Sequence, residues 1–279
     1  VSFSTAGSTD ALSGLAGCTA VASLATDDPS HTVVTTCTDV AGNSDTASLT
    51  VKRDATPPTI SATPDRPANA SGWYRANVTL AFTCADATSG VGTCPDSEVV
   101  SDEGSTPVSA TVTDQAGNQA TSPALTIRLD RTAPAAQVAA TTAPNSAGWY
   151  RTDVAFATTG SDALSGVETC TTPATLDDDA TGHVATGTCT DRAGNTSPVA
   201  SSAPVNRDTV KPTLLLAAAS APNAAGWYRQ NVPFVLTKSD DRSGIDTASC
   251  TGPAPITAEG TGLTTTASCS DVAGNSASV

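Results

Sequence analysis

The sequence is poor in the residues that build large hydrophobic cores. It contains no methionine, its aromatic residues amount to 4% of 279 residues, and its only histidines are His31 and His183. No apolar run approaches the roughly 20 residues of a membrane-spanning helix, and no stretch carries an apolar stripe at helical spacing. One large core is hard to build from such material, whereas several small cores with additional support are feasible.

Positive charge is also scarce. Lys and Arg number 13 against 27 Asp and Glu, which gives a formal net charge of −14. An acidic surface repels the phosphates of nucleic acids and anionic lipids, and attracts cations. We therefore expect neither a nucleic-acid partner nor membrane insertion within this segment.

No catalytic constellation stands out in the sequence. It has no Gly-rich phosphate loop and no HExxH motif. Neither histidine gains a cysteine nucleophile if all cysteines are bridged. The acidic run Asp177-Asp178-Asp179 is typical of a solvated loop. These features predict that the chain is not an enzyme.

What the sequence does contain is an internal repeat. A Gly-Trp-Tyr-Arg segment occurs three times at spacings of 76 and 78 residues, and Ala-Gly-Asn occurs four times at spacings of 75, 77 and 80. Short β-prone runs lie between Gly, Pro, Asn and Asp punctuation, which is typical of a sandwich. The first motif begins at Gly72, Gly148 and Gly226, and the second at Ala41, Ala116, Ala193 and Ala273.

The motif spacings predict four copies of one unit of about 77 residues. About seven short strands per copy fit an immunoglobulin-like sandwich. We therefore predict an all-β tandem array of immunoglobulin-like β-sandwich repeats, with both terminal repeats incomplete and further domains of a longer parent chain on either side. The predicted repeats are 1–53, 54–129, 130–207 and 208–279.

The eight cysteines come two per repeat, and their spacing predicts one disulfide in each. There is no CxxC pair, and two histidines are too few for zinc sites, so structural bridges are favoured. In the second repeat Val112 replaces the second cysteine and an extra Cys84 appears. Each bridge should contribute about 3 kcal/mol and indicates an oxidising, extracellular compartment. The predicted pairs are Cys18–Cys37, Cys84–Cys94, Cys170–Cys189 and Cys250–Cys269.

The Asp-x-Ala-Gly-Asn segments allow two interpretations. In the first, each is a hairpin turn in which Asp accepts amide hydrogens and Gly supplies a positive φ. In the second, the turn Asp joins the linker Asp and an Asp after the second strand to bind Ca²⁺ through carboxylate oxygens. The predicted triads are Asp54, Asp86 and Asp114; Asp130, Asp162 and Asp191; and Asp208, Asp240 and Asp271.

Arginine side chains offer an alternative to calcium. Arg53, Arg131 and Arg207 each lie next to a linker Asp and could neutralise it directly. The sequence leaves both possibilities open.

The tryptophans of the Gly-Trp-Tyr segments also allow two roles. Trp73, Trp149 and Trp227 could stack on sugars, but one per repeat is the pattern expected of architecture. We therefore predict that they cover the end of each small sandwich or pack at a junction.

Taken in order, the linker Asp and Pro, Asn-x-x-Gly-Trp-Tyr, the paired Cys and Cys-x-Asp-x-Ala-Gly-Asn resemble the bacterial immunoglobulin-like repeats of secreted and surface-anchored proteins. That resemblance implies a non-catalytic extracellular array acting as a spacer, stalk or fibre. Alternatives are a self-assembling filament or sheath subunit, an adhesin module binding carbohydrate or protein, and an accessory region of a secreted hydrolase. The Trp-to-Cys arrangement of antibody domains is missing, and the second repeat departs from the cysteine pattern of its neighbours.

Overall fold

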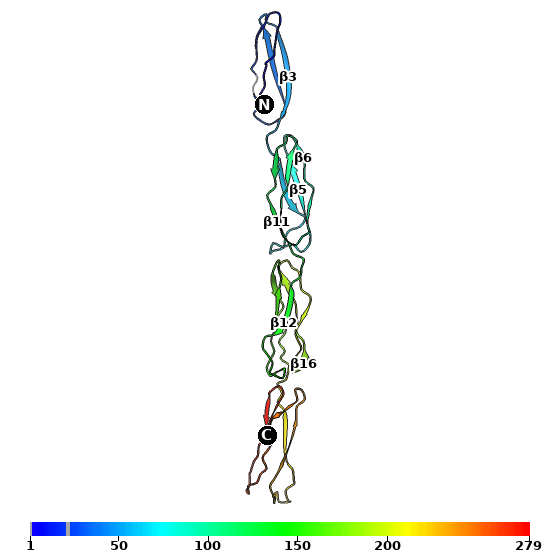
Figure 1. The fold of residues 1–279 in the computed structure, drawn as a ribbon, viewed down its shortest axis with the longest axis vertical. Helices are drawn as coiled ribbons and strands as arrows, with labels where there is room; N and C mark the ends of the chain where they lie inside the picture. The colour runs from blue at the N-terminus through cyan, green and yellow to red at the C-terminus, as the bar shows by residue number, and fades with distance from the viewer. Residues whose placement is uncertain (1, 21–22) are drawn as a thin grey trace. The chain divides into compact units, whose positions relative to one another are not determined.

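The computed structural model describes residues 2–20 and 23–279 as strands, turns and loops (Figure 1). It divides into two compact units, Val1–Arg131 and Thr132–Val279. The described residues form no helix that is long and apolar enough to cross a membrane.

The first unit contains the first two repeats. Its strands pair in the orders β1-β2-β3, β4-β5-β7, β10-β9-β6 and β11-β8. Their bounds are β1 (Leu15–Cys18), β2 (Asp28–Asp39), β3 (Ser44–Arg53), β4 (Thr59–Pro64), β5 (Val78–Ala85), β6 (Val91–Thr93), β7 (Glu98–Val100), β8 (Gly104–Val108), β9 (Thr111–Asp114), β10 (Gln119–Thr121) and β11 (Leu125–Leu129).

The second repeat shows why these short segments fold into a sandwich. Along β5, Val78 and Leu80 are fully buried while Ala81 is exposed, which is the two-residue alternation of a half-buried strand. Their face packs on residues from the other strands and the Gly-Trp-Tyr segment. That core consists of Tyr74, Val78, Leu80, Val100, Val108, Ile127 and Leu129.

The second unit contains the third and fourth repeats. Its strands pair in the orders β12-β14, β13-β20-β16, β15-β18, β17-β19, β21-β22 and β23-β24-β25. Their bounds are β12 (Ala135–Ala140), β13 (Trp149–Tyr150), β14 (Phe156–Ser161), β15 (Val167–Cys170), β16 (Ala180–His183), β17 (Thr186–Gly187), β18 (Cys189–Asp191), β19 (Ala200–Ser201), β20 (Val205–Arg207), β21 (Thr213–Ala218), β22 (Phe234–Ser239), β23 (Ile245–Thr251), β24 (Ser268–Asp271) and β25 (Ser276–Ser278).

The closing strand β20 is central to the third repeat. It pairs in parallel with β13, where Tyr150 lies opposite Arg207, and antiparallel with β16 on its other side. The core beneath it repeats the plan of the second repeat. It consists of Val138, Tyr150, Val154, Phe156, Leu176, Ala185 and Val205.

The predicted all-β array of immunoglobulin-like repeats is confirmed by this strand content and pairing. Strand β14 extends through Ser161, because its residues pair in register with all of β12. Val154 makes only an isolated bridge to Leu176.

The fourth repeat departs from its neighbours at the Gly-Trp-Tyr segment. Trp227 is 54% exposed and Tyr228 is 37% exposed. Trp227 is therefore more exposed among the described residues than the half-buried Trp73 and Trp149. The physical reason is that no described residue pairs with this segment in the way that β20 pairs with β13.

Candidate functional site

The Asp-x-Ala-Gly-Asn segments form the predicted turn in all four repeats. In the fourth, Asp271 accepts the Asn275 backbone N–H at Oδ1 and its side-chain amide at Oδ2, each at 2.8 Å. Asp39, Asp114 and Asp191 bind Asn43, Asn118 and Asn195 in the same way. The turn glycines, such as Gly274 at φ 94°, supply the left-handed backbone.

The turn Asn also binds the linker that enters its repeat. Asn275 Nδ2 donates to the Asp208 carbonyl at 2.9 Å and to the Val210 carbonyl at 3.3 Å. Asn118 Nδ2 makes the same two contacts to Asp54 and Thr56, each at 3.4 Å. This bond places the linker Asp beside the turn Asp.

The third carboxylate comes from the turn after the second strand of each repeat. Asp240 Oδ1 accepts the Gly244 N–H at 2.7 Å. In the first unit, Asp86 Oδ1 accepts the Gly90 N–H at 2.8 Å. The linker carboxylate caps the same turn, since Asp208 Oδ2 accepts the Ser243 N–H at 3.1 Å.

Two predicted triads therefore assemble, one in each unit. Each triad offers three carboxylate oxygens that lie within 4.8 Å of one another. Asp208 and Asp271 are 0% and 1% exposed. The members are Asp54, Asp86 and Asp114 in the first unit, and Asp208, Asp240 and Asp271 in the second.

The middle triad is divided between the two units. Asp162 and Asp191 belong to the second unit and make the usual turn bonds, including Asp162 Oδ1 to the Gly166 N–H at 2.8 Å. Asp130 belongs to the first unit, where its N–H donates to the Tyr74 carbonyl at 2.9 Å.

The linker arginines bind other groups. Arg53 pairs with Asp27, Arg131 pairs with Glu103, and Arg207 pairs with the side chains of Asp153 and Asp179. Within the described residues, no ion pair joins the triads of Asp54 and Asp208 to Lys or Arg. Arg53 and Arg207 thus form their ion pairs with other carboxylates, while the charge of Arg53 also contributes to lowering the pKa of Asp54.

Hydrogen bonds favour the ionised form of the first linker carboxylate. The Ser89 hydrogen bond, opposed by burial and aided by the Thr56 amide, holds the pKa of Asp54 below its ordinary value. A triad of ionised carboxylates repels itself unless a cation is present. Oxygen ligands at this density suit a hard divalent ion such as Ca²⁺.

Four disulfides staple the repeats, one in each. In the first and third repeats they join residues that face each other across an antiparallel strand pair, Cys18 with Cys37 and Cys170 with Cys189. Their Cα atoms are 4.0 Å apart. The other two bridges are Cys84–Cys94 and Cys250–Cys269.

The second repeat forms its disulfide between a different pair of positions. The reason is that one position on the strand after the Gly-Trp-Tyr segment faces the disulfide in every repeat. Gly160 in β14 is equivalent by strand register to Cys84 in β5. A Cβ atom at Gly160 would lie 2.7 Å from Cys189 Sγ. A cysteine side chain at position 160 would thus occupy the same space as the side chain of Cys189. The second repeat has Cys84 at the position equivalent to Gly160, and Val112 at the position equivalent to Cys189.

The Gly-Trp-Tyr segment positions tyrosine, which the sequence reasoning missed, as the core residue. Tyr74 and Tyr150 are 9% and 7% exposed, whereas Trp73 and Trp149 are only half-buried. The turn is closed by Asn, since Asn145 Oδ1 accepts the Trp149 N–H at 2.9 Å. The general signal for this role is that a tyrosine can be buried when its hydroxyl finds a hydrogen-bond partner.

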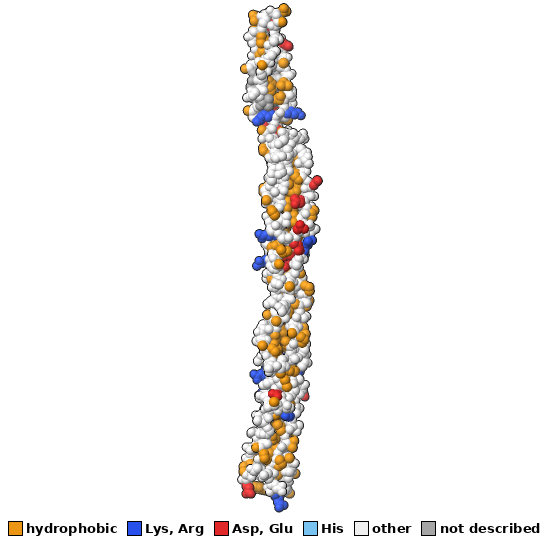
Figure 2. All heavy atoms as spheres, viewed as in Figure 1, with side chains coloured by type: hydrophobic (Ala, Val, Ile, Leu, Met, Phe, Trp, Pro, Cys, Tyr) orange, Lys and Arg blue, Asp and Glu red, His pale blue; other side chains and the backbone are white. Residues whose placement is uncertain are grey.

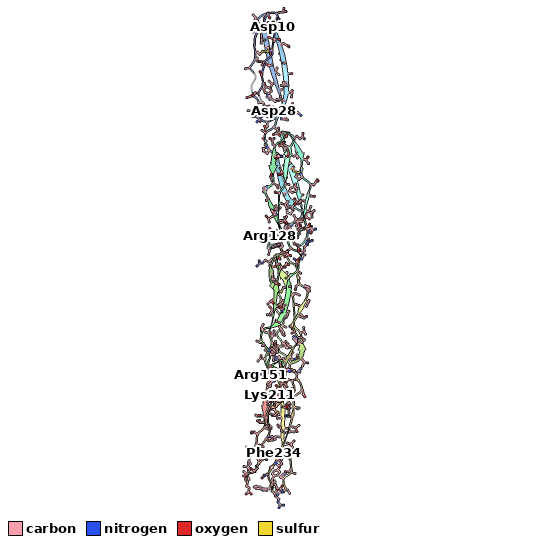
Figure 3. All side chains as sticks on the ribbon, in the orientation of Figure 1. Asp10, Asp28, Arg128, Arg151, Lys211 and Phe234 are labelled. Carbon is pink, nitrogen blue, oxygen red and sulfur yellow. A yellow bond between two sulfur atoms is a disulfide. The ribbon has the colours of Figure 1, made fainter. Side chains whose placement is uncertain are left out.

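Sequence reasoning also missed a contact between repeats within the second unit. Asn145 Nδ2 donates to the Val272 carbonyl at 2.9 Å, and Arg151 Nη1 donates to the Gly274 carbonyl at 2.9 Å. Arg151 is labelled in Figure 3. The Asn and Arg of one Gly-Trp-Tyr-Arg segment thereby bind the Ala-Gly-Asn turn of the next repeat.

No model of a known protein family matches the sequence, and no curated protein matches it either. Several solved structures do match. The fibronectin(III)-like modules of Clostridium thermocellum CbhA match at 12% identity and a TM-score of 0.26, covering 53% of this chain and 95% of theirs. Protocadherin Gamma B2 extracellular cadherin domains 3–6 match at 12% identity and a TM-score of 0.34, covering 90% of this chain and 81% of theirs.

A tetra-tandem repeat in the extending region of a large adhesion protein matches at 17% identity and a TM-score of 0.28, covering 91% of this chain and 81% of its own. All of these TM-scores are below 0.5. The fold is defined by the strand pairing and the cores of the repeats.

Proposed function

We propose that the chain is a non-catalytic extracellular spacer, in which small stapled sandwiches are held in sequence by bonds at their junctions. The observation that carries the proposal is the bonding of the Asp-x-Ala-Gly-Asn turn. It holds its own linker through Asn275 and, within the second unit, accepts hydrogen bonds from Asn145 and Arg151 of the preceding repeat. Short bonded linkers restrict bending between neighbouring units of a quasi-one-dimensional array.

The composition of the surface agrees with a spacer. On the face shown in Figure 2, most side chains are uncharged and the apolar ones form several small, separate groups. Scattered apolar residues are ordinary on a protein surface, whereas a large continuous patch marks a binding site. The disulfides support an oxidising compartment outside the cytosol.

Small-angle X-ray scattering on the full chain tests the spacer. We expect a maximum dimension that is independent of protein concentration and that shrinks when Asn145→Ala and Arg151→Ala are combined, because their bonds to the next turn are lost. The matched control is Asn223→Ala with Arg229→Ala at the corresponding segment of the fourth repeat, where Asn223 Oδ1 accepts the same local N–H from Trp227. A scattering curve that is unchanged by both double variants contradicts the proposed role of these junction bonds.

The proposed spacer also binds Ca²⁺ at its aspartate triads. The support is that three carboxylates converge within 4.8 Å, that Arg53 and Arg207 form their ion pairs with carboxylates outside the triads, and that the linker and the turn each contribute one ligand. A cation there would cross-link the linker to two turns of the repeat that follows it.

A second candidate is a filament subunit, favoured by the fourth repeat. Its Trp227–Tyr228 segment borders a groove of about 980 Å³ that is also lined by Phe234, Ile256 and Leu263. In the third repeat the equivalent edge is occupied, since the Asp208 N–H donates to the Tyr150 carbonyl at 3.0 Å. An open edge of this kind can accept a further strand, either from a continuation of the same chain or from another chain.

Sedimentation velocity over a concentration series decides between the two candidates. A filament subunit gains apparent mass as concentration rises, and an excess of a peptide spanning 201–210 should suppress that growth by occupying the groove. A scrambled peptide of the same composition is the control. A constant monomer mass at all concentrations excludes the filament and leaves the spacer.

A further inference from the structure

A lysine lies on the inner face of the fourth repeat. Along β22, Phe234, Leu236 and Lys238 are half-buried while Val235, Thr237 and Ser239 are exposed. Lys238 therefore points inward with the two apolar residues; Phe234, the first residue of the strand, is labelled in Figure 3. Inward lysines are rare because an ammonium group loses hydration there.

This lysine contacts the disulfide of its repeat. Lys238 Nζ lies 3.1 Å from Cys250 Sγ, which is bonded to Cys269. Within the described residues, Lys238 forms no ion pair with a carboxylate. Its positive charge is therefore directed at sulfur instead of being neutralised by an acid, in a chain with a net charge of −14.

The equivalent positions in the other repeats carry no charge. Strand register makes Lys238 the counterpart of Gly160 and Cys84, because the partners Leu214, Ala136 and Ile60 occupy corresponding places on the first strand. In the first repeat the motif spacing places Ser8 here, and its Oγ lies 3.6 Å from Cys37 Sγ. The position adjoins the bridge throughout, but only the fourth repeat supplies an ammonium group.

We propose that the Cys250–Cys269 disulfide is a thiol–disulfide exchange site for small thiols, with Lys238 as its positioning residue. A thiolate attacks Cys250 Sγ, the more accessible of the two sulfurs, because Cys269 is 1% exposed while Cys250 is half-buried. A bond forms between the incoming sulfur and Cys250, the Cys250–Cys269 bond breaks, and Cys269 leaves as a thiolate. A second small thiol then attacks the incoming sulfur, releases Cys250 as a thiolate and departs as the oxidised small-molecule disulfide.

The ammonium favours each stage of this exchange. It attracts the anionic nucleophile, stabilises the negative charge that spreads over the sulfurs in the transition state, and lowers the basicity of the leaving thiolate. These effects act at short range and in a partly desolvated place, where Coulomb interactions exceed those in water.

The third repeat provides a matched internal control. Its bridge Cys170–Cys189 spans the same 19-residue separation, and its Cα atoms are 4.0 Å apart against 4.1 Å in the fourth. The two cysteine pairs also have the same burial, half-buried for the first and 1% exposed for the second. The charge of Lys238 is the main chemical difference next to the sulfurs.

The experiment exposes the native full chain to reduced glutathione at neutral pH, quenches samples with an alkylating agent, and measures each bridge by peptide mass spectrometry. We expect Cys250–Cys269 to open roughly 10-fold faster than Cys170–Cys189. Lys238→Gln should remove most of that difference, whereas Lys238→Arg should retain most of it. Circular dichroism establishes that the variants keep the fold of the parent chain.

Two further readouts separate the charge effect from local opening of the fourth repeat. Added salt should slow the exchange at Cys250–Cys269 more than at Cys170–Cys189, because only the former depends on attraction between a cationic side chain and an anionic thiol that approaches from solvent. The rate at which Cys250–Cys269 opens, relative to Cys170–Cys189, should be higher with anionic mercaptoacetate than with cationic cysteamine. Equal rates in Lys238→Gln and the parent chain, or no preference among thiols of different charge, would overturn the proposal.

Discussion

Removing the bridge of the third repeat by combining Cys170→Ala with Cys189→Val is expected to lower the free energy of unfolding of that repeat by about 3 kcal/mol. The loss comes from the greater conformational freedom of the unfolded chain once its 19-residue loop is open. Hydrogen-exchange mass spectrometry of peptides from β14 and β18 measures this locally. Peptides from the second repeat, with its bridge intact, are the control.

Moving the bridge should restore most of that stability. With Cys170 retained, Gly160→Cys together with Cys189→Val recreates the arrangement of Cys84, Cys94 and Val112 in the second repeat. The new 10-residue separation should contribute about 3 kcal/mol, slightly less than the original loop. Gly160→Cys alone should instead destabilise the repeat, since its Cβ meets Cys189 Sγ at 2.7 Å. A double variant as unstable as the unbridged one would show that the second repeat accommodates its bridge by some other means.

Asp240→Asn is expected to raise the stability of the fourth repeat without calcium and to lower it, relative to the parent chain, with calcium. The substitution keeps the Oδ1 bond to the Gly244 N–H and removes one of three clustered negative charges. In chelator it should stabilise the fourth repeat by roughly 1 kcal/mol, because like-charge repulsion is relieved. In calcium at about 100-fold its dissociation constant, the parent chain should gain about 2.7 kcal/mol per site, and the variant should lose most of that gain.

Differential scanning calorimetry with calcium and with chelator measures both signs. Asp246→Asn is a matched control, because Asp246 lies in the same repeat but outside the triad. Asp86→Asn should behave like Asp240→Asn in the second repeat, where Asp86 has the same role. Identical transitions in calcium and chelator for the parent chain would exclude the cation and leave the turn as the sole role of these aspartates.

The local features of this protein were accessible from sequence because they repeat. A spacing near 77 residues, a two-residue alternation in short runs and paired cysteines predict stapled sandwiches without any knowledge of packing. The Asp-x-Ala-Gly-Asn turn was equally accessible, since an Asx side chain and a glycine with positive φ define it locally. The bridge in the second repeat followed from an even count of cysteines and one displaced residue.

Other features depended on contacts that no local pattern encodes. Tyr150, and not Trp149, enters the core because β13 pairs in parallel with β20, which lies more than fifty residues later in the chain. Arg207 reaches Asp153 and Asp179 instead of the adjacent Asp208, since its side chain leaves the closing strand on the other side. Trp227 differs from its counterparts because its segment has no strand partner among the described residues.

The sequence by itself determined the fold class, the repeat and its turns, because these follow from periodicity, from the backbone freedom of glycine and from side chains that bond within a few residues. Only the tertiary structure decided that Lys238 faces a disulfide, that the arginines leave the aspartates, and that one inward position controls which cysteines pair. Each of those outcomes depends on which residues strand register brings together across the sandwich, and register is a property of the folded chain.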